Sequence, residues 1–222
     1  MQFLIDSANL AEVEEAFRLP FVQGVTTNTR EVAYHRGADL KGYLSELRRI
    51  ARGTIHIQVT SADTDTMIRE GRALTKAVDD IRIKMPVTAN GLAAMQVLAS
   101  EGIEVAATAV NTVAMGVLAA KMGAARVISY FGALADFEED AGDLLAATKA
   151  AFTAYGFPTE VYFFAKNAKQ VKMGIQAGAD ACLMPLAGLK SLLDHPLSTR
   201  EVEFMNAEWE RVYGSIRWDE VV

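Results

Sequence analysis

The segment Ile81-Arg-Ile-Lys-Met-Pro-Val-Thr88 has the pattern of a short buried β-strand with one lysine, Lys84, near its carboxyl end. Its alternating apolar residues predict the strand, and Pro86 predicts where the strand ends. Lysine is rarely buried in full without a specific reason. An amine in apolar surroundings is shifted toward its neutral form, which is the nucleophile of Schiff-base chemistry. The alternative is a structural lysine whose ammonium group extends to water from the end of the strand.

Strand and helix patterns alternate along the chain on both sides of this segment. Strands are predicted at residues 3–6, 21–25, 54–60, 81–86, 103–109, 126–131, 159–164 and 181–184. Helices are predicted at residues 10–18, 39–52, 63–78, 88–100, 112–122, 136–154, 167–177 and 186–193, with Asn111 as the cap of the fifth. Alternation of this kind predicts a parallel sheet, and eight units close most naturally into a (β/α)8 TIM barrel. We therefore expect one barrel domain over residues 1–222.

One more helix is predicted after the eight units, at residues 198–213. It follows Pro196, and Ser198-Thr-Arg-Glu201 matches a capping box. Its apolar side chains exceed what a lone terminal helix normally exposes to water. They are Val202, Phe204, Met205, Trp209 and Val212. We expect this helix to take part in a subunit contact.

The composition excludes several classes of protein. Hydrophobic residues make up 51% of the 222 residues, which argues against disorder, and the net charge of −6 argues against nucleic acid as the main partner. The single cysteine, Cys182, excludes an intrachain disulfide and a cysteine-rich metal site. No apolar run reaches the length of about 18 residues that a transmembrane helix needs, and the start of the chain lacks the pattern of a signal peptide. We expect a cytosolic protein with no membrane partner.

Polar side chains recur where the predicted strands end. Because the active site of a (β/α)8 barrel lies at the carboxyl ends of its strands, these side chains are expected to converge. Each could be an ordinary strand-end residue, but several at one barrel mouth predict an active site. In chain order they are Asp6, Thr26, Thr27, Asn28, Gln58, Lys84, Thr108, Tyr130 and Lys166.

Short segments around these residues match the pattern of a known family. They are Phe3-Leu-Ile-Asp6, Gly24-Val-Thr-Thr-Asn28, His56-Ile-Gln-Val59, Ile83-Lys-Met-Pro-Val-Thr88 with Gly91-Leu-Ala93, Glu101-Gly-Ile103 and Thr108-Ala-Val110. In this order and spacing, the sequence resembles the transaldolase family of class I aldolases over nearly its whole length. Within that family it resembles the fructose-6-phosphate aldolase-like branch.

The resemblance implies covalent catalysis by Lys84. The lysine would attack a ketone carbonyl and lose water to give an iminium, which lets the adjacent carbon–carbon bond break and leaves an enamine. Tyr130 matches the position that exchanges the proton, and Gln58 and Thr108 match the positions that hold the catalytic water. No metal and no cofactor are implied, because the iminium replaces a Lewis acid.

The resemblance also implies the binding groups. Asp6 and Asn28 match positions that bind the hydroxyls of a dihydroxyacetone unit, and Asp6 is also able to take a proton. Thr26 and Thr27 are expected beside them as substrate-binding residues. The implied partner is a small sugar or sugar phosphate. The implied assembly is a homo-oligomer built from rings, a decamer.

Three positions depart from the family pattern at the expected phosphate site. Ala133 stands where the family usually has an arginine, and Phe164 stands where it has a serine. Lys166 keeps one point charge. The loop after the second strand reads Asn28-Thr-Arg30 where the family has proline and serine, and Arg30 either compensates or is solvated at a helix start. We therefore expect Schiff-base chemistry with altered recognition of phosphate.

Three functions are compatible with these observations. The first is a class I aldolase that uses dihydroxyacetone or a related ketone as donor, which Gln58 and Tyr130 favour because small transaldolases tend to carry glutamate and phenylalanine there. The second is a transaldolase that moves a three-carbon unit between sugars. The third is a sugar-binding barrel without turnover. Two interior residues also have open roles. His56 is expected to be a hydrogen-bonded structural histidine, with a second catalytic base as the alternative, and Arg82 would either repel Lys84 or pair with an interior acid.

Overall fold

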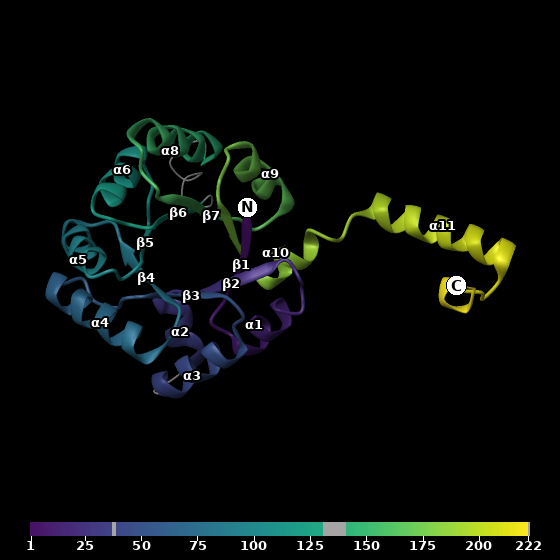
Figure 1. The fold of residues 1–222 in the computed structure, drawn as a ribbon, viewed down its shortest axis with the longest axis horizontal. Helices are drawn as coiled ribbons and strands as arrows, with labels where there is room; N and C mark the ends of the chain where they lie inside the picture. Colours follow the sequence, from purple (N-terminus) through teal and green to yellow (C-terminus); the bar gives the residue numbers. More distant parts are fainter. Residues whose placement is uncertain (37–38, 131–140, 222) are drawn as a thin grey trace.

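A computed structural model describes residues 1–36, 39–130 and 141–221, and in them eight parallel strands form one closed barrel in the order β1-β2-β3-β4-β5-β6-β7-β8 (Figure 1). The strands are β1 (Gln2–Asp6), β2 (Val22–Thr26), β3 (Thr54–Gln58), β4 (Ile81–Pro86), β5 (Val105–Thr108), β6 (Arg126–Tyr130), β7 (Glu160–Phe164) and β8 (Ala181–Met184). Strand β8 pairs with β1 and closes the barrel. The predicted (β/α)8 fold is confirmed.

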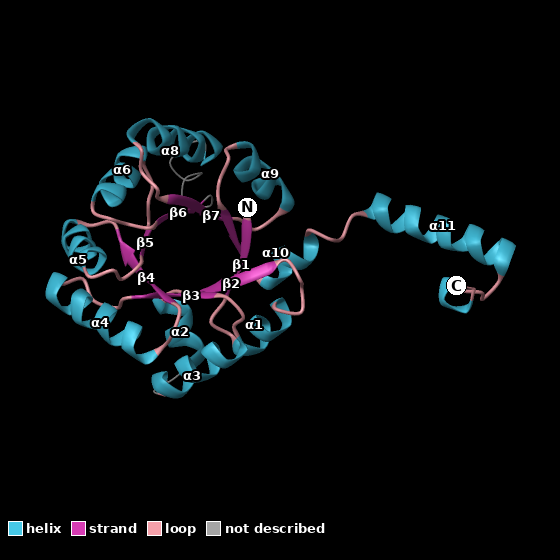
Figure 2. Cartoon of the chain, in the orientation of Figure 1, coloured by secondary structure: helices cyan, strands magenta, loops and turns pink. Residues whose placement is uncertain are grey.

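Helices surround the barrel on the outside, as Figure 2 shows. They are α1 (Leu10–Ala16), α2 (Thr29–Arg36), α3 (Leu40–Ile50), α4 (Thr64–Ala77), α5 (Ala89–Ser100), α6 (Val113–Lys121), α8 (Ala141–Tyr155), α9 (Ala168–Gln176) and α10 (Leu186–Ser191). None of the helices in the described ranges has the length and apolar character needed to cross a membrane.

The alternation of side chains along the strands divides the core in two. Odd-numbered residues such as Ile83 and Phe163 belong to the large apolar cluster between the strands and the helices. Even-numbered residues of β1 and of β3 to β7, and odd-numbered residues of β8, point into the barrel, where a second, smaller cluster forms. It consists of Leu4, Ala106, Ile128, Tyr162, Ala181 and Leu183, with Tyr130 and Phe164 packed against it. The predicted catalytic residues share this even numbering, so the fold directs them inward.

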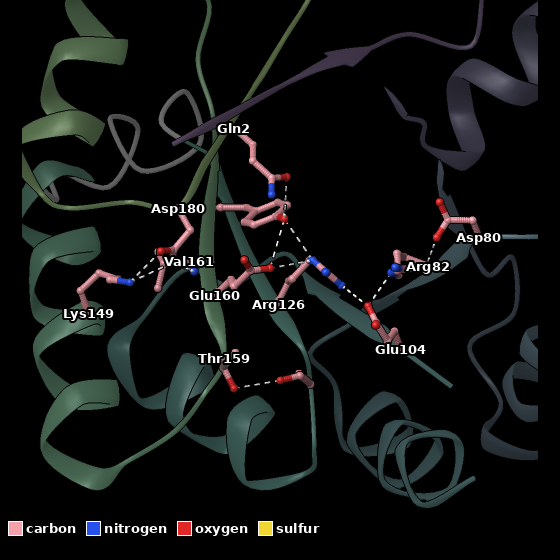
Figure 3. A network of polar contacts seen from close by, with 12 residues as sticks. Gln2, Asp80, Arg82, Glu104, Arg126, Lys149, Thr159, Glu160, Val161 and Asp180 are labelled. Atoms are coloured by element: carbon pink, nitrogen blue, oxygen red, sulfur yellow. Dashed lines mark hydrogen bonds and ion pairs between the residues drawn. The ribbon is translucent and has the colours of Figure 1, made fainter. Parts of the chain in front are cut away.

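Charged side chains fill the amino-terminal end of the barrel (Figure 3). Arg82 forms ion pairs with Asp80, at 2.9 Å, and with Glu104. Arg126 pairs with Glu104 at 2.6 Å and with Glu160 at 2.9 Å. Of the two roles left open for Arg82, pairing with acids is therefore the one observed.

Two predicted details of the helices are wrong, and two predicted segments run into residues that the structure does not describe. Helix α2 was not predicted, because Thr-Arg-Glu-Val-Ala-Tyr-His-Arg has no repeating apolar face, although its Val32 packs against the core. The fifth predicted helix is capped by Thr112 in place of Asn111. The helix expected at residues 136–154 is seen from Ala141, and its first residues lie outside the described ranges. Strand β6 ends at Tyr130, and Phe131 is likewise outside them.

The last helix, α11 (Pro196–Tyr213), extends away from the barrel, and none of its residues is buried (Figure 1). It starts two residues earlier than predicted, because Pro196 fits the first helical turn and the His195 side chain caps it by accepting from the backbone N–H of Leu197. The predicted capping box is therefore not used. Beyond the helix the chain folds back, and Trp209 Nε1 donates to the carbonyl of Ile216 at 2.9 Å.

Candidate active site

Lys84 is fully buried inside the barrel, with 0% of its surface exposed. Its Nζ donates to the backbone carbonyl of Thr27 at 2.7 Å and to Thr26 Oγ1 at 3.2 Å. This geometry excludes the alternative of a lysine that extends to water. A neutral amine has two hydrogens and one lone pair, so these two acceptors leave the lone pair free for attack on a carbonyl.

The neighbouring strands determine the space around Lys84. Its Cα pairs with that of Gln58 in β3 and with that of Ala106 in β5. Gln58 is half-buried, so its amide is in the layer of side chains at the carboxyl end of the barrel. Ala106 is fully buried and belongs to the interior apolar cluster. The pairing therefore places the predicted water-holding amide on the strand next to the predicted nucleophile.

Asp6 ends strand β1, and its Oδ1 is buried without a hydrogen-bond partner among the described residues. Burial raises the pKa of this carboxyl to about 6, while the charge of Lys84 lowers it and the charge of Glu31 adds a smaller increase. A carboxyl with this pKa can take up and release a proton near neutral pH. Glu31 was not singled out from the sequence, because nothing in the pattern of α2 placed it near Asp6.

Thr108 and Tyr130 meet at the mouth of the barrel, with 3.4 Å between their hydroxyl oxygens. Thr108 is buried and Tyr130 is half-buried. The ring of Phe164, from the adjacent strand β7, lies against the Tyr130 ring with 5.8 Å between centroids. An apolar ring thus borders the expected proton donor on the side of strand β7.

Three residues at the end of β2 and directly after it have contacts that define their roles. Asn28 Oδ1 accepts from the backbone N–H of Glu31 at 3.0 Å, which caps α2 and leaves the amide hydrogens of Asn28 for a ligand. Thr26 and Thr27, which we expected to bind substrate, both contact the Lys84 amine. The alternation of side chains along the strand could have predicted that Thr26 points into the barrel. The role of the Thr27 carbonyl depends on the geometry of the loop, which no local sequence pattern predicts.

The basic residues expected to receive phosphate are exposed. Lys166 follows β7 and Arg30 is the second residue of α2. Neither forms an ion pair with any residue in the described ranges. Ala133 lies outside those ranges. The described residues therefore show two basic side chains near the ends of β7 and β2, with no contact between them.

No group of histidine, cysteine, aspartate and glutamate in the described part of the chain could hold a metal ion. The polar groups that converge at the mouth are an amine, hydroxyls, an amide and a carboxyl.

Comparison with known proteins gives a consistent result. Residues 3–218 match the family described as Transaldolase/Fructose-6-phosphate aldolase. "Probable transaldolase 1" of Listeria monocytogenes is 36% identical over 211 residues, which are 95% of this chain and 98% of that protein. "Probable transaldolase" of Heliobacterium modesticaldum is 36% identical over 213 residues, covering 96% and 99%. "Probable transaldolase" of Aquifex aeolicus is 33% identical over 213 residues, covering 96% and 98%.

Proposed function

Because the chain belongs to the transaldolase/fructose-6-phosphate aldolase family and is an aldolase or transaldolase enzyme, we propose that it is a class I aldolase that uses Lys84 to form a Schiff base. It makes or breaks a carbon–carbon bond between a dihydroxyacetone-type donor and an aldehyde. The observation that carries this proposal is the fully buried Lys84 amine, held by two oxygen acceptors.

The first step joins the donor to the enzyme. The Lys84 amine attacks the ketone carbonyl, and the carbinolamine loses water to give the iminium. Asp6 and Asn28 bind the donor hydroxyls, for which the free amide hydrogens of Asn28 are suited. Gln58 and Thr108 hold the water that leaves here and returns when the iminium is hydrolysed.

The second step makes or breaks the carbon–carbon bond. In cleavage, a base takes the proton from the hydroxyl of the departing carbon, the bond breaks, and its electrons form the enamine. Tyr130 performs this proton transfer, and its contact with Thr108 links the hydroxyl to the site of the catalytic water. Asp6, with a pKa of about 6, then supplies the proton that converts the enamine carbon back to the iminium, and water hydrolyses the iminium to free dihydroxyacetone and the Lys84 amine.

Borohydride trapping tests the Schiff base. The protein is incubated with dihydroxyacetone or fructose 6-phosphate, reduced, and weighed intact. We expect one adduct per chain that is lost in Lys84→Ala and kept in the control Lys172→Ala, which changes an exposed lysine of α9. No adduct with any ketose would reject both the aldolase and the transaldolase.

The acceptor is proposed to be bound with altered recognition of phosphate. Phe164 beside Tyr130 makes this side of the mouth apolar, and Lys166 offers a point charge without a bidentate partner among the described residues. We expect similar kcat/KM values for glyceraldehyde and its 3-phosphate. A strong preference for the phosphate that disappears in Lys166→Ala would contradict this.

Transaldolase activity is the second candidate, favoured by the names of the relatives. The two activities differ in whether free dihydroxyacetone is released. Fructose 6-phosphate alone should yield dihydroxyacetone with an aldolase, whereas a transaldolase turns over only when an acceptor aldose phosphate is added. The barrel without turnover, our third hypothesis, is not favoured by any observation.

The assembly is proposed to be a homo-oligomer in which α11 packs on another copy of the chain. The helix has no buried residue and exposes Phe204, Met205 and Val212 by more than half. Because most helical stability in proteins comes from packing of an apolar face, a helix that extends away from the barrel with such a face exposed is expected to pack on another surface. Light scattering should give a multiple of 24.1 kDa for the full chain, and truncation before Pro196 should lower that multiple. An unchanged mass after truncation would reject the contact.

A further inference from the structure

His56 is the buried polar side chain near Lys84 that the proposed mechanism does not use. It is 0% exposed, and neither ring nitrogen has a hydrogen-bond partner among the described residues. The sequence predicted a structural histidine whose ring is hydrogen-bonded. This prediction is wrong as far as partners among the described residues are concerned. Its ring stacks on Tyr162 with 5.9 Å between centroids. Since buried polar atoms are nearly always paired with protein or ordered water, the imidazole points to a small polar ligand.

His56 is connected to both groups that hold the lysine amine. Its backbone carbonyl accepts from Thr27 N at 3.0 Å and from Thr27 Oγ1 at 3.3 Å, and the carbonyl of Thr27 accepts from Lys84. Its Cα pairs with that of Thr26 across β2 and β3, so the two side chains project to the same side of the sheet. Both side chains therefore lie inside the barrel on neighbouring strands.

The Thr26 hydroxyl has a hydrogen that is not used by the lysine. Its oxygen accepts from Lys84 Nζ at 3.2 Å, and a hydroxyl that accepts still has its own O–H to donate. No group in the described ranges accepts that hydrogen. Burial and the charges of Arg126, Lys84 and Arg82 lower the pKa of His56 well below 6.5. The imidazole is therefore neutral, with one donor nitrogen and one acceptor nitrogen.

We propose that His56 binds a buried water that accepts the hydroxyl hydrogen of Thr26 and donates to the imidazole, which makes His56 a positioning residue for Lys84. With the Thr26 hydrogen directed to this water, a lone pair of Oγ1 faces Nζ. The nucleophilic form of the amine then keeps its two hydrogens on Thr26 and Thr27, so its lone pair is directed away from both oxygens. No bond forms or breaks at the water. The inference rests on the proposed Schiff-base function.

The variant His56→Phe tests this role, because phenylalanine keeps a ring against Tyr162 and removes both nitrogens. We expect the rate of borohydride-trapped adduct formation with dihydroxyacetone to fall about tenfold, with KM for the donor little changed, since small misplacements of a reacting group cost this much or more. His56→Asn is the conservative control. Its amide can bind the same water, so it should recover most of the rate.

A double-mutant cycle separates positioning from packing. Thr26→Val should slow trapping as His56→Phe does, and the double variant should be no slower than either, because both remove the same arrangement. Trapping at the wild-type rate in His56→Phe, or effects that multiply in the double variant, would overturn the inference.

A crystal structure of the wild-type protein at high resolution provides the second test. It should show a water between Thr26 Oγ1 and the His56 ring, and no density there would also overturn the inference, even if the variants fail to fold. A wild-type protein that forms no adduct would instead reject the proposed function.

Discussion

Replacing Asp6 with asparagine should make the protein more stable at neutral pH while it removes activity. The Asp6 carboxyl is buried, its Oδ1 has no partner among the described residues, and its pKa is raised from 3.8 to about 6. At about 1.36 kcal/mol per unit of pKa, the ionised carboxylate costs the native state about 3 kcal/mol. Asparagine has nearly the same shape and stays neutral, so Asp6→Asn should raise the free energy of unfolding by up to about 3 kcal/mol at pH 7.5.

The sign of this effect defines its pH dependence. Between pH 3.8 and about 6 the native protein holds a proton on Asp6 that the unfolded chain has released. Stability contributed by this group therefore falls as pH rises through that window, and above it the full cost is present. The advantage of Asp6→Asn should be largest above pH 7 and should shrink toward zero near pH 4.

Urea unfolding followed by far-UV circular dichroism measures the difference between the two proteins at each pH. Protein concentration is held fixed, because a subunit contact would make the transition depend on it. Asp65→Asn, which changes an exposed residue of α4, is the control and should shift the free energy by no more than about 0.5 kcal/mol. The reasoning is refuted if Asp6→Asn gives no stabilisation at pH 7.5, or a stabilisation that is the same at pH 4.5.

Three further predictions concern stability. Glu104 pairs with two arginines at the base of the barrel but is partly exposed, so Glu104→Gln should lower the free energy of unfolding by about 1–2 kcal/mol in urea titrations. The control Glu46→Gln removes an exposed pair and should cost less than about 0.5 kcal/mol. A Cβ at Gly174 would lie 2.0 Å from Phe163 Cζ, so Gly174→Ala should lower the free energy of unfolding by about 1–3 kcal/mol or prevent folding. A melting temperature equal to that of wild type would contradict this packing. The pKa of His56 is held well below 6.5 in the native protein, so as pH falls the unfolded chain binds a proton on this residue before the native protein does. His56 should therefore make the free energy of unfolding fall as pH drops below about 6.5. In His56→Phe the loss of stability between about pH 6.5 and 5 should be shallower.

The fold could be predicted because its signal repeats along the chain. Eight short apolar strands alternate with helices, and the same pattern that places Ile83 outside the barrel places Lys84 inside it. Helix α2 was missed because its sequence is mostly polar and its contact with the core is small. The start of α11 was misjudged because Pro196 was interpreted as a break, although proline is suited to the first turn of a helix.

The candidate site was predicted as a set of residues, but not as a set of contacts. Strand ends give the positions of Asp6, Lys84 and Tyr130, because parallel strands bring their carboxyl ends to one face. The acceptors of the lysine amine were assigned another role, since a backbone carbonyl such as that of Thr27 leaves no mark in the sequence. The pKa of Asp6 depends on burial from several strands and on Glu31, which only the folded chain brings together.

The charged base of the barrel is compatible with the Lys84 amine above it because the base is internally paired. Arg82 and Arg126 alone would place two positive charges below Lys84. Glu104 pairs with both arginines, and Asp80 and Glu160 each pair with one, so the positive charges are offset where they arise. The environment of the amine is then determined mainly by its nearest groups, which are two threonine oxygens and the Asp6 carboxyl. Loss of Glu104 should consequently reduce stability more than the rate of Schiff-base trapping, whereas loss of the Thr26 hydroxyl should reduce the trapping rate more than stability.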